Sequence, residues 1–187
     1  IRDPISSGTM RTIYAAMILQ NLTVDGNPEK GYDWLSKLDA NTKEYTLNST
    51  LMLQKLGREE ATVTLWNMPD IELQKTKYDF PIDYIIPSSG TPILTDAIAI
   101  VRGTKHLEAA QAYYEFVTNP ENIALASKLF YRIPSRNDIE PEKLPLWIQN
   151  LDIKEMYMDW EMVEENSQDW MEYWDSYIRG GKWAILN

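Results

Sequence analysis

The sequence contains no cysteine and only one histidine, His106, and these two shortages exclude several kinds of site. Without cysteine the chain can form no disulfide, no thiolate nucleophile and no cysteine-ligated zinc centre. With one histidine it cannot build a multi-histidine metal site, and a Ser–His–Asp triad would have to use His106. That residue ends the turn Gly103-Thr104-Lys105-His106, where a surface histidine is the ordinary interpretation. We therefore expect no catalytic residue, no metal and no cofactor.

Positive charge and long apolar runs are also scarce. Lysine and arginine total 18 against 28 acidic residues, which leaves a formal net charge of −10. Because a nucleic-acid-binding protein needs a basic face to displace counterions, we expect no nucleic-acid partner. No apolar run approaches the roughly 20 residues of a membrane-spanning helix. No signal peptide is recognisable and a motif is already under way at Ile1, so we expect a segment of a longer protein.

The stretch Asp3-Pro4-Ile5-Ser6-Ser7-Gly8-Thr9 directly precedes a helical pattern. In that pattern apolar residues recur at the spacing of one helix face, from Met10 to Ile18. Ser6 or Ser7 stands where the N-cap belongs, and Gly8 allows close approach to the backbone. The unpaired N–H groups at a helix start attract anions. The stretch is therefore either a plain cap or a small anion-binding cup.

Helical patterns alternate with β-favouring segments along the chain. The β-favouring segments are 44–47, 61–66, 82–86 and 93–101, and the longest helical pattern after the first runs from about 153 to 178. This alternation predicts an α/β fold, in which ligands bind outside the carboxyl ends of strands. Trp66 is either a ligand contact or a core residue. The ligand-binding residues that we expect are Ser6, Ser7, Gly8, Thr9, Asn48, Trp66 and Asn67.

Several stretches, taken in order, resemble the extracytoplasmic solute-binding proteins of bacterial ABC importers, and in particular the ferric-iron-binding-like branch of family 1. They are Asp3–Thr9, Gly31–Asn41, the cap at Asn48, Tyr84–Pro92, Ala97–Ile100, Ala109–Val117, Asn119–Asn122 and Ile133–Arg136. The resemblance implies a three-layer αβα lobe of the periplasmic-binding-protein type 2 fold, with C-terminal helices.

The resemblance also implies how the chain is divided. Residues 1–86 would form the second ligand-binding lobe, and residues 87–92 the crossover between lobes. Residues 93–150 would be a return segment of the first lobe, and residues 151–187 a C-terminal helix packed back on the second lobe. Because most of the first lobe would then be missing, we expect weak solute binding and self-association through exposed apolar surface.

The implied function is capture of a small, anionic or polar solute for import through an ABC transporter permease, without catalysis. The expected location is outside the cytoplasm, in the periplasm or as a membrane-anchored lipoprotein. In the family, the loop matching Ser6–Thr9 offers donors to an anion, and positions near Asn48 and Asn67 line the cleft. Iron-binding members carry two adjacent tyrosines where this chain has Trp66-Asn67, so we expect no high-affinity Fe(III) site.

Two other functions remain open from the sequence. An α/β enzyme, such as a transferase, could hold a phosphorylated substrate in the same helix-start cup, although the shortage of histidine and cysteine disfavours it. A ligand-sensing regulatory domain would normally be fused to a basic DNA-binding segment, and this acidic chain shows none.

Overall fold

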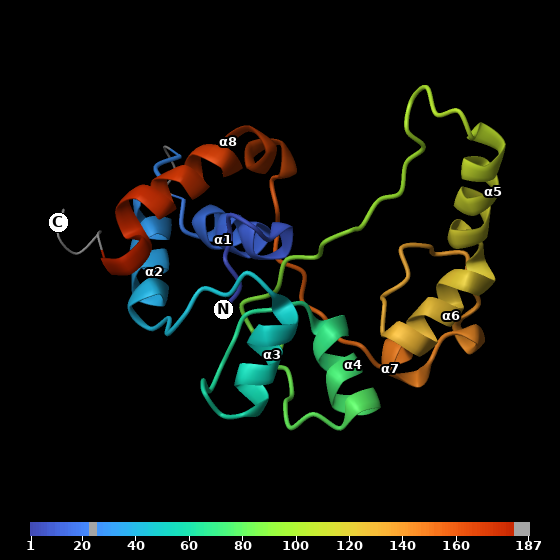
Figure 1. Cartoon of the computed structure of the whole chain (residues 1–187), viewed down its shortest axis with the longest axis horizontal. Helices are drawn as coiled ribbons and strands as arrows, with labels where there is room; N and C mark the ends of the chain where they lie inside the picture. The colour runs from blue at the N-terminus through green and yellow to red at the C-terminus, as the bar shows by residue number, and fades with distance from the viewer. Residues whose placement is uncertain (23–25, 182–187) are drawn as a thin grey trace. The chain divides into compact units, whose positions relative to one another are not determined.

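The structure is a computed structural model that describes residues 1–22 and 26–181 (Figure 1). The described residues divide into two compact units, the first formed by Ile1–Asn67, Ile86–Ile93 and the chain from Lys154 onward, and the second by Met68–Ile85 and Leu94–Ile153. The elements are α1 (Gly8–Gln20), α2 (Glu29–Ala40), α3 (Ser49–Gly57), α4 (Met68–Tyr78), α5 (Leu107–Thr118), α6 (Pro120–Phe130), η1 (Pro141–Lys143), α7 (Leu146–Gln149), α8 (Trp160–Tyr173), η2 (Trp174–Ile178) and η3 (Arg179–Gly181).

The core of the first unit forms where α1 packs against α2, α8 and η2 (Figure 1). Of the apolar stripe that the sequence predicts, Met10, Tyr14 and Ile18 are buried and Ile13 and Met17 are half-buried. Ala15 and Ala16, outside that stripe, are also buried. The Tyr14 ring meets the Trp174 ring edge-on at 5.4 Å between centroids. A Cβ atom at Gly31 would lie 2.6 Å from the Ile18 Cα, so the close approach of α1 and α2 requires glycine at that position.

The predicted three-layer α/β fold is wrong for the described residues, which are helical and contain no sheet. Their only β-type pairings are two isolated parallel bridges, Arg2 with Thr46 and Thr91 with Glu155. A β-branched pattern favours extended backbone, but a strand also needs a hydrogen-bonded neighbour. No described segment forms a ladder with 61–66, 82–86 or 93–101, and in those segments Val63, Ile85 and Val101 are 75%, 92% and 76% exposed.

Most helix bounds follow the sequence signals closely. The Asn119 side chain accepts a hydrogen bond from the Glu121 N–H at 2.8 Å, and Pro120 opens α6. The last helix begins at Trp160 and not near 153, because the Asp159 carboxylate caps it and the preceding chain pairs with Thr91. The part of the expected C-terminal segment from 182 to 187 lies outside the described residues.

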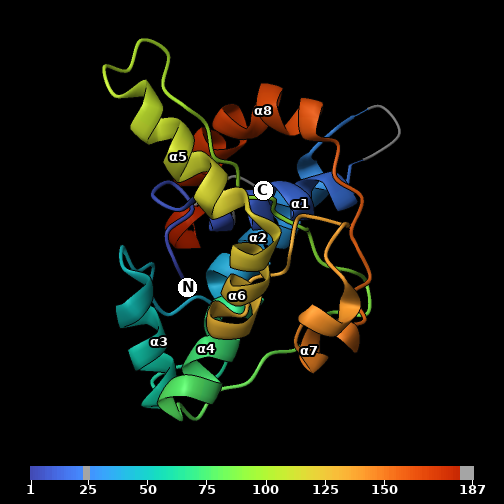
Figure 2. The same cartoon turned by 90° about the vertical axis from the view of Figure 1, so that its right-hand side faces the viewer.

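The second unit has a much smaller core. Helix α6 contacts both α5 and α4 (Figure 2), and Arg132 and Asp70 form an ion pair at 3.3 Å. Helix α5 has no buried residue. The buried residues described in this unit are Ile71, Ala124, Ser127 and Ile139. None of the helices in the described part of the chain combines the length and the hydrophobicity needed to cross a bilayer.

Candidate functional site

The residues before α1 form a turn that ends in a helix cap. The Asp3 Oδ1 atom accepts hydrogen bonds from the backbone N–H groups of Ile5 at 2.8 Å and Ser6 at 3.3 Å. Ser7, with an extended backbone, is the N-cap, and its buried hydroxyl accepts a hydrogen bond from Met10 N–H at 3.4 Å. The cap therefore falls on Ser7, and its hydroxyl oxygen is already engaged within the chain.

Gly8 and Thr9 provide the first backbone N–H groups of α1. The first intrahelical bond closes between Arg11 N–H and Ser7 C=O at 2.9 Å, so the N–H groups of Gly8 and Thr9 precede the regular ladder. Gly8 is exposed, and a Cβ atom added there would meet no heavy atom within 4 Å. Open space thus borders the end of α1 that carries the positive end of the helix dipole.

Asn48 plays the same part for α3 that Ser7 plays for α1. Its side chain accepts a hydrogen bond from the Leu51 N–H at 3.1 Å. The parallel bridge between Arg2 and Thr46 joins the segments that lead into the two helices, through Thr46 N–H to Ile1 C=O at 2.9 Å and Asp3 N–H to Thr46 C=O at 3.0 Å. Because the two segments run in the same direction, the starts of α1 and α3 both follow the same end of the bridge.

Trp66 and Asn67 end the first stretch of the first unit. Trp66 is half-buried and packs against the core cluster of α1, α2, α8 and η2, as the core interpretation of this residue predicts. The preceding chain is held by Thr64, whose hydroxyl donates to the Met52 sulfur at 3.2 Å. Asn67 is half-buried directly before α4. The Arg2–Thr46 bridge thus joins the segments that lead into Ser6–Thr9 and Asn48, and Trp66 has a core contact.

A polar cluster that the sequence patterns did not predict forms around the buried Asp39. Asp39 of α2 accepts hydrogen bonds from the Tyr45 hydroxyl at 2.6 Å and from the Gly181 N–H at 2.9 Å. Burial, and then this bond to Asp39, raise the pKa of Tyr45, so its phenol keeps its proton and donates it. Among the buried carboxylates of this unit, only Asp3 had a local signal in the sequence. Its position before Ser6 and Ser7 is typical of an Asx-turn.

Metal-binding side chains do not gather in the residues that the structure describes. No group of three His, Asp or Glu side chains there could hold a metal ion. His106 is exposed at the N-terminus of α5, where its backbone N–H donates to the Thr104 hydroxyl at 3.2 Å. At its two helix starts the first unit carries hydroxyl, amide and backbone N–H groups.

Comparison with known proteins gives one family and two relatives. Residues 9–155 match the family described as bacterial extracellular solute-binding protein. An uncharacterized protein of Haemophilus influenzae is 27% identical over 128 residues, which cover 68% of this chain and 35% of that protein. A probable ABC transporter periplasmic-binding protein of Sinorhizobium fredii is 24% identical over 178 residues, which cover 91% of this chain and 48% of that protein. The chain thus spans half or less of the curated relatives it matches, and no solved structure shows a significant match.

Proposed function

We propose that this chain, which belongs to the bacterial extracellular solute-binding protein family, captures a small solute for delivery to the membrane permease of an ABC importer. The observation that carries the proposal is the family match over residues 9–155. The name of the relative from Sinorhizobium fredii points the same way. We place the protein outside the cytoplasm, in the periplasm or as a membrane-anchored lipoprotein.

We place the solute at the starts of α1 and α3, whose preceding segments are joined by the Arg2–Thr46 bridge. Two helix N-termini supply N–H groups and partial positive charge, which favours an anionic or polar ligand over an apolar one. The exposed Ser6 and Gly8, the half-buried Thr9 and the cap at Asn48 would contact it, while Ser7 shapes the loop through its cap bond. Trp66 and Asn67 complete the proposed set, with Trp66 presenting whatever surface the core leaves uncovered.

The proposed division of the chain keeps residues 1–86 as a ligand-binding lobe, 87–92 as the crossover, 93–150 as a return segment and 151–187 as a segment that packs back on that lobe. The changes between the two compact units near residues 86, 94 and 154 support this proposal, whereas Met68–Ile85 belong to the second unit and not to the unit of Ile1–Asn67. In the described part of the chain from 154 onward, α8 contacts α1 and η2 contacts α2.

Tryptophan fluorescence provides the direct test, since the chain contains seven tryptophans and Trp66 belongs to the proposed set. The chain is titrated with inorganic phosphate, sulfate, methylphosphonate, spermidine and glucose. We expect saturable changes with the oxyanions only, and weak affinity, since the chain spans half or less of its relatives.

Two results would contradict the proposal. Binding of spermidine or glucose with no response to any oxyanion would refute the anionic assignment. If this chain bound an oxyanion with micromolar or tighter affinity, equal to that of a protein as long as the relatives, the expectation that additional residues complete the site would be refuted.

A further inference from the structure

Arg179, in the last described turn, joins two distant parts of the first unit. Its Nη1 atom donates to Asp175 Oδ1 at 2.8 Å, an ordinary i, i+4 pair near the helix end. Its Nη2 atom donates to Asp3 Oδ2 at 3.0 Å, across 176 positions of sequence. The Asp3 side chain is 5% exposed and the Arg179 side chain 36%, so the arginine covers a carboxylate that water barely reaches.

The two oxygens of the Asp3 carboxylate accept hydrogen bonds from different partners. Oδ2 receives Arg179, and Oδ1 receives the N–H groups of Ile5 and Ser6. The Asp3 backbone is itself fixed by its N–H bond to Thr46 C=O at 3.0 Å. The turn that leads into the Ser6–Thr9 loop is thus tied to a carboxylate whose charge is balanced by Arg179.

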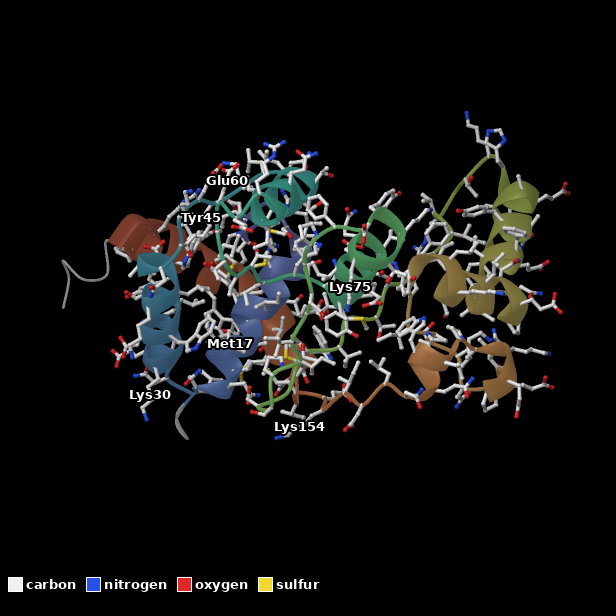
Figure 3. The ribbon with its side chains drawn as sticks, turned by 90° about the horizontal axis from the view of Figure 1, so that it is seen from below. Met17, Lys30, Tyr45, Glu60, Lys75 and Lys154 are labelled. Carbon is white, nitrogen blue, oxygen red and sulfur yellow. The ribbon has the colours of Figure 1, made fainter. Side chains whose placement is uncertain are left out.

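Arg179 is in turn held in place from both sides. Its guanidinium carbon lies 5.2 Å from the ring centroid of Tyr45, a residue labelled in Figure 3. The next two residues, Gly180 and Gly181, have φ values of +73° and +78°, which favour glycine, and their N–H groups donate to the two oxygens of Asp39 at 3.2 and 2.9 Å. Successive N–H groups that donate to one carboxylate form an anion-binding nest. The Arg179 side chain therefore projects from a backbone that these bonds hold in place.

We propose that Arg179 is a positioning residue for the solute site, acting through Asp3 to orient the first N–H groups of α1. This inference rests on the function proposed above. Removal of one partner of a buried ion pair leaves the other charge uncompensated, so Asp3 without Arg179 rotates toward water or recruits it. Either change releases the N–H groups of Ile5 and Ser6 and loosens the loop.

Amide hydrogen exchange of the ligand-free chain tests the positioning directly. We expect Arg179→Gln to accelerate exchange of the Ile5 and Ser6 amides about tenfold, with the amides of α3 unchanged. The matched control is Asp175→Asn, which removes the other partner of the same guanidinium and should leave these two amides as in the wild type.

The variant Asp3→Asn separates action through Asp3 from a general effect. An asparagine amide oxygen can still accept from Ile5 and Ser6, but it forms no ion pair with Arg179. In the Asp3→Asn background, Arg179→Gln should therefore add nothing to the exchange rates. If Arg179→Gln prevents folding, Arg179→Lys is used in its place. The lysine ammonium reaches only one carboxylate, so the exchange rates of Ile5 and Ser6 should lie between those of the wild type and those expected for Arg179→Gln.

Binding of inorganic phosphate, followed by tryptophan fluorescence, links the loop to the site. We expect the phosphate affinity of Arg179→Gln to fall about fivefold while that of Asp175→Asn stays unchanged, since a loosened loop must be ordered on binding. Unchanged Ile5 and Ser6 exchange in Arg179→Gln, or acceleration spread evenly over the unit, would overturn the inference. Accelerated exchange in a protein whose wild type binds no phosphate would support the positioning and count against the proposed oxyanion solute.

Discussion

Replacement of Gly31 by alanine tests the packing of α1 on α2, which supports the proposed site. The alanine Cβ would lie 2.6 Å from Ile18 Cα and 3.0 Å from Ile18 Cγ1. An ordinary contact needs 3.4 Å or more, and because the nearest atom belongs to the backbone, no side-chain rotation relieves the clash. The two helices must therefore move apart at the centre of the core.

Two opposing contributions set the size of the effect. Extra atoms forced into a well-packed core cost about 1–3 kcal/mol, and a backbone neighbour places this case in the upper part of that range. Alanine stabilises a helix interior over glycine by roughly 1 kcal/mol, and by less near the helix start where Gly31 lies. We therefore expect the free energy of unfolding to fall by about 1–2 kcal/mol.

Urea unfolding followed by tryptophan fluorescence measures this change, because Trp170 and Trp174 lie in the same core cluster. The matched control is Gly8→Ala, a second helical glycine of the same unit, whose added Cβ would meet open space. We expect Gly31→Ala, but not Gly8→Ala, to lower the urea midpoint of unfolding. The slope of the unfolding free energy against urea concentration should be unchanged in both variants. A Gly31→Ala chain as stable as the wild type would refute the close packing described between α1 and α2.

Four further results are expected. Gly8→Ala should weaken binding of inorganic phosphate at an unchanged unfolding midpoint, because its methyl group obstructs the start of α1; equal affinity in titration would move the site elsewhere. Asn48→Ala should lower the free energy of unfolding by about 1 kcal/mol through loss of the α3 cap, measured in urea. Stability should decline as pH rises above 10, because burial raises the pKa of Tyr14 and Tyr45 in the folded chain, so the unfolded chain loses those protons first; a flat profile from pH 9 to 11 would contradict those shifts. Added Fe(III) should give no tyrosinate charge-transfer band, since Trp66-Asn67 replaces the tyrosine pair of iron-binding members.

Local patterns predicted the helices well, because each signal acts within a few residues. Three residues of the predicted apolar stripe of α1, Met10, Tyr14 and Ile18, are buried, and Asn119-Pro120 stands at the start of α6. The resemblance to solute-binding proteins is confirmed by the family match. The cap of α3 at Asn48 was also found from the sequence.

The predicted strands failed for a reason that no local pattern contains. The segment 61–66 has the β-branched composition of a strand, yet a strand is defined by its hydrogen-bonded neighbours, and the described chain supplies it with none. The segment 44–47 forms part of the pairing that a strand needs, because Thr46 makes an isolated parallel bridge with Arg2. Composition therefore marked segments that form no helix, but it did not predict that they would lack strand partners.

The candidate site divides along the same line between local and distant interactions. The residues that cap helices, Ser7 and Asn48, act on amides three positions away and could be found by spacing alone. The contact of Arg179 with Asp3 spans 176 positions, and the bond from Gly181 to Asp39 spans 142. No periodicity or motif links such pairs, because the core packing of α1, α2 and η2 is what brings them together. If Arg179 positions the loop as we propose, a determinant of solute affinity is therefore encoded in the packing of the helices and not in the motif that the solute touches.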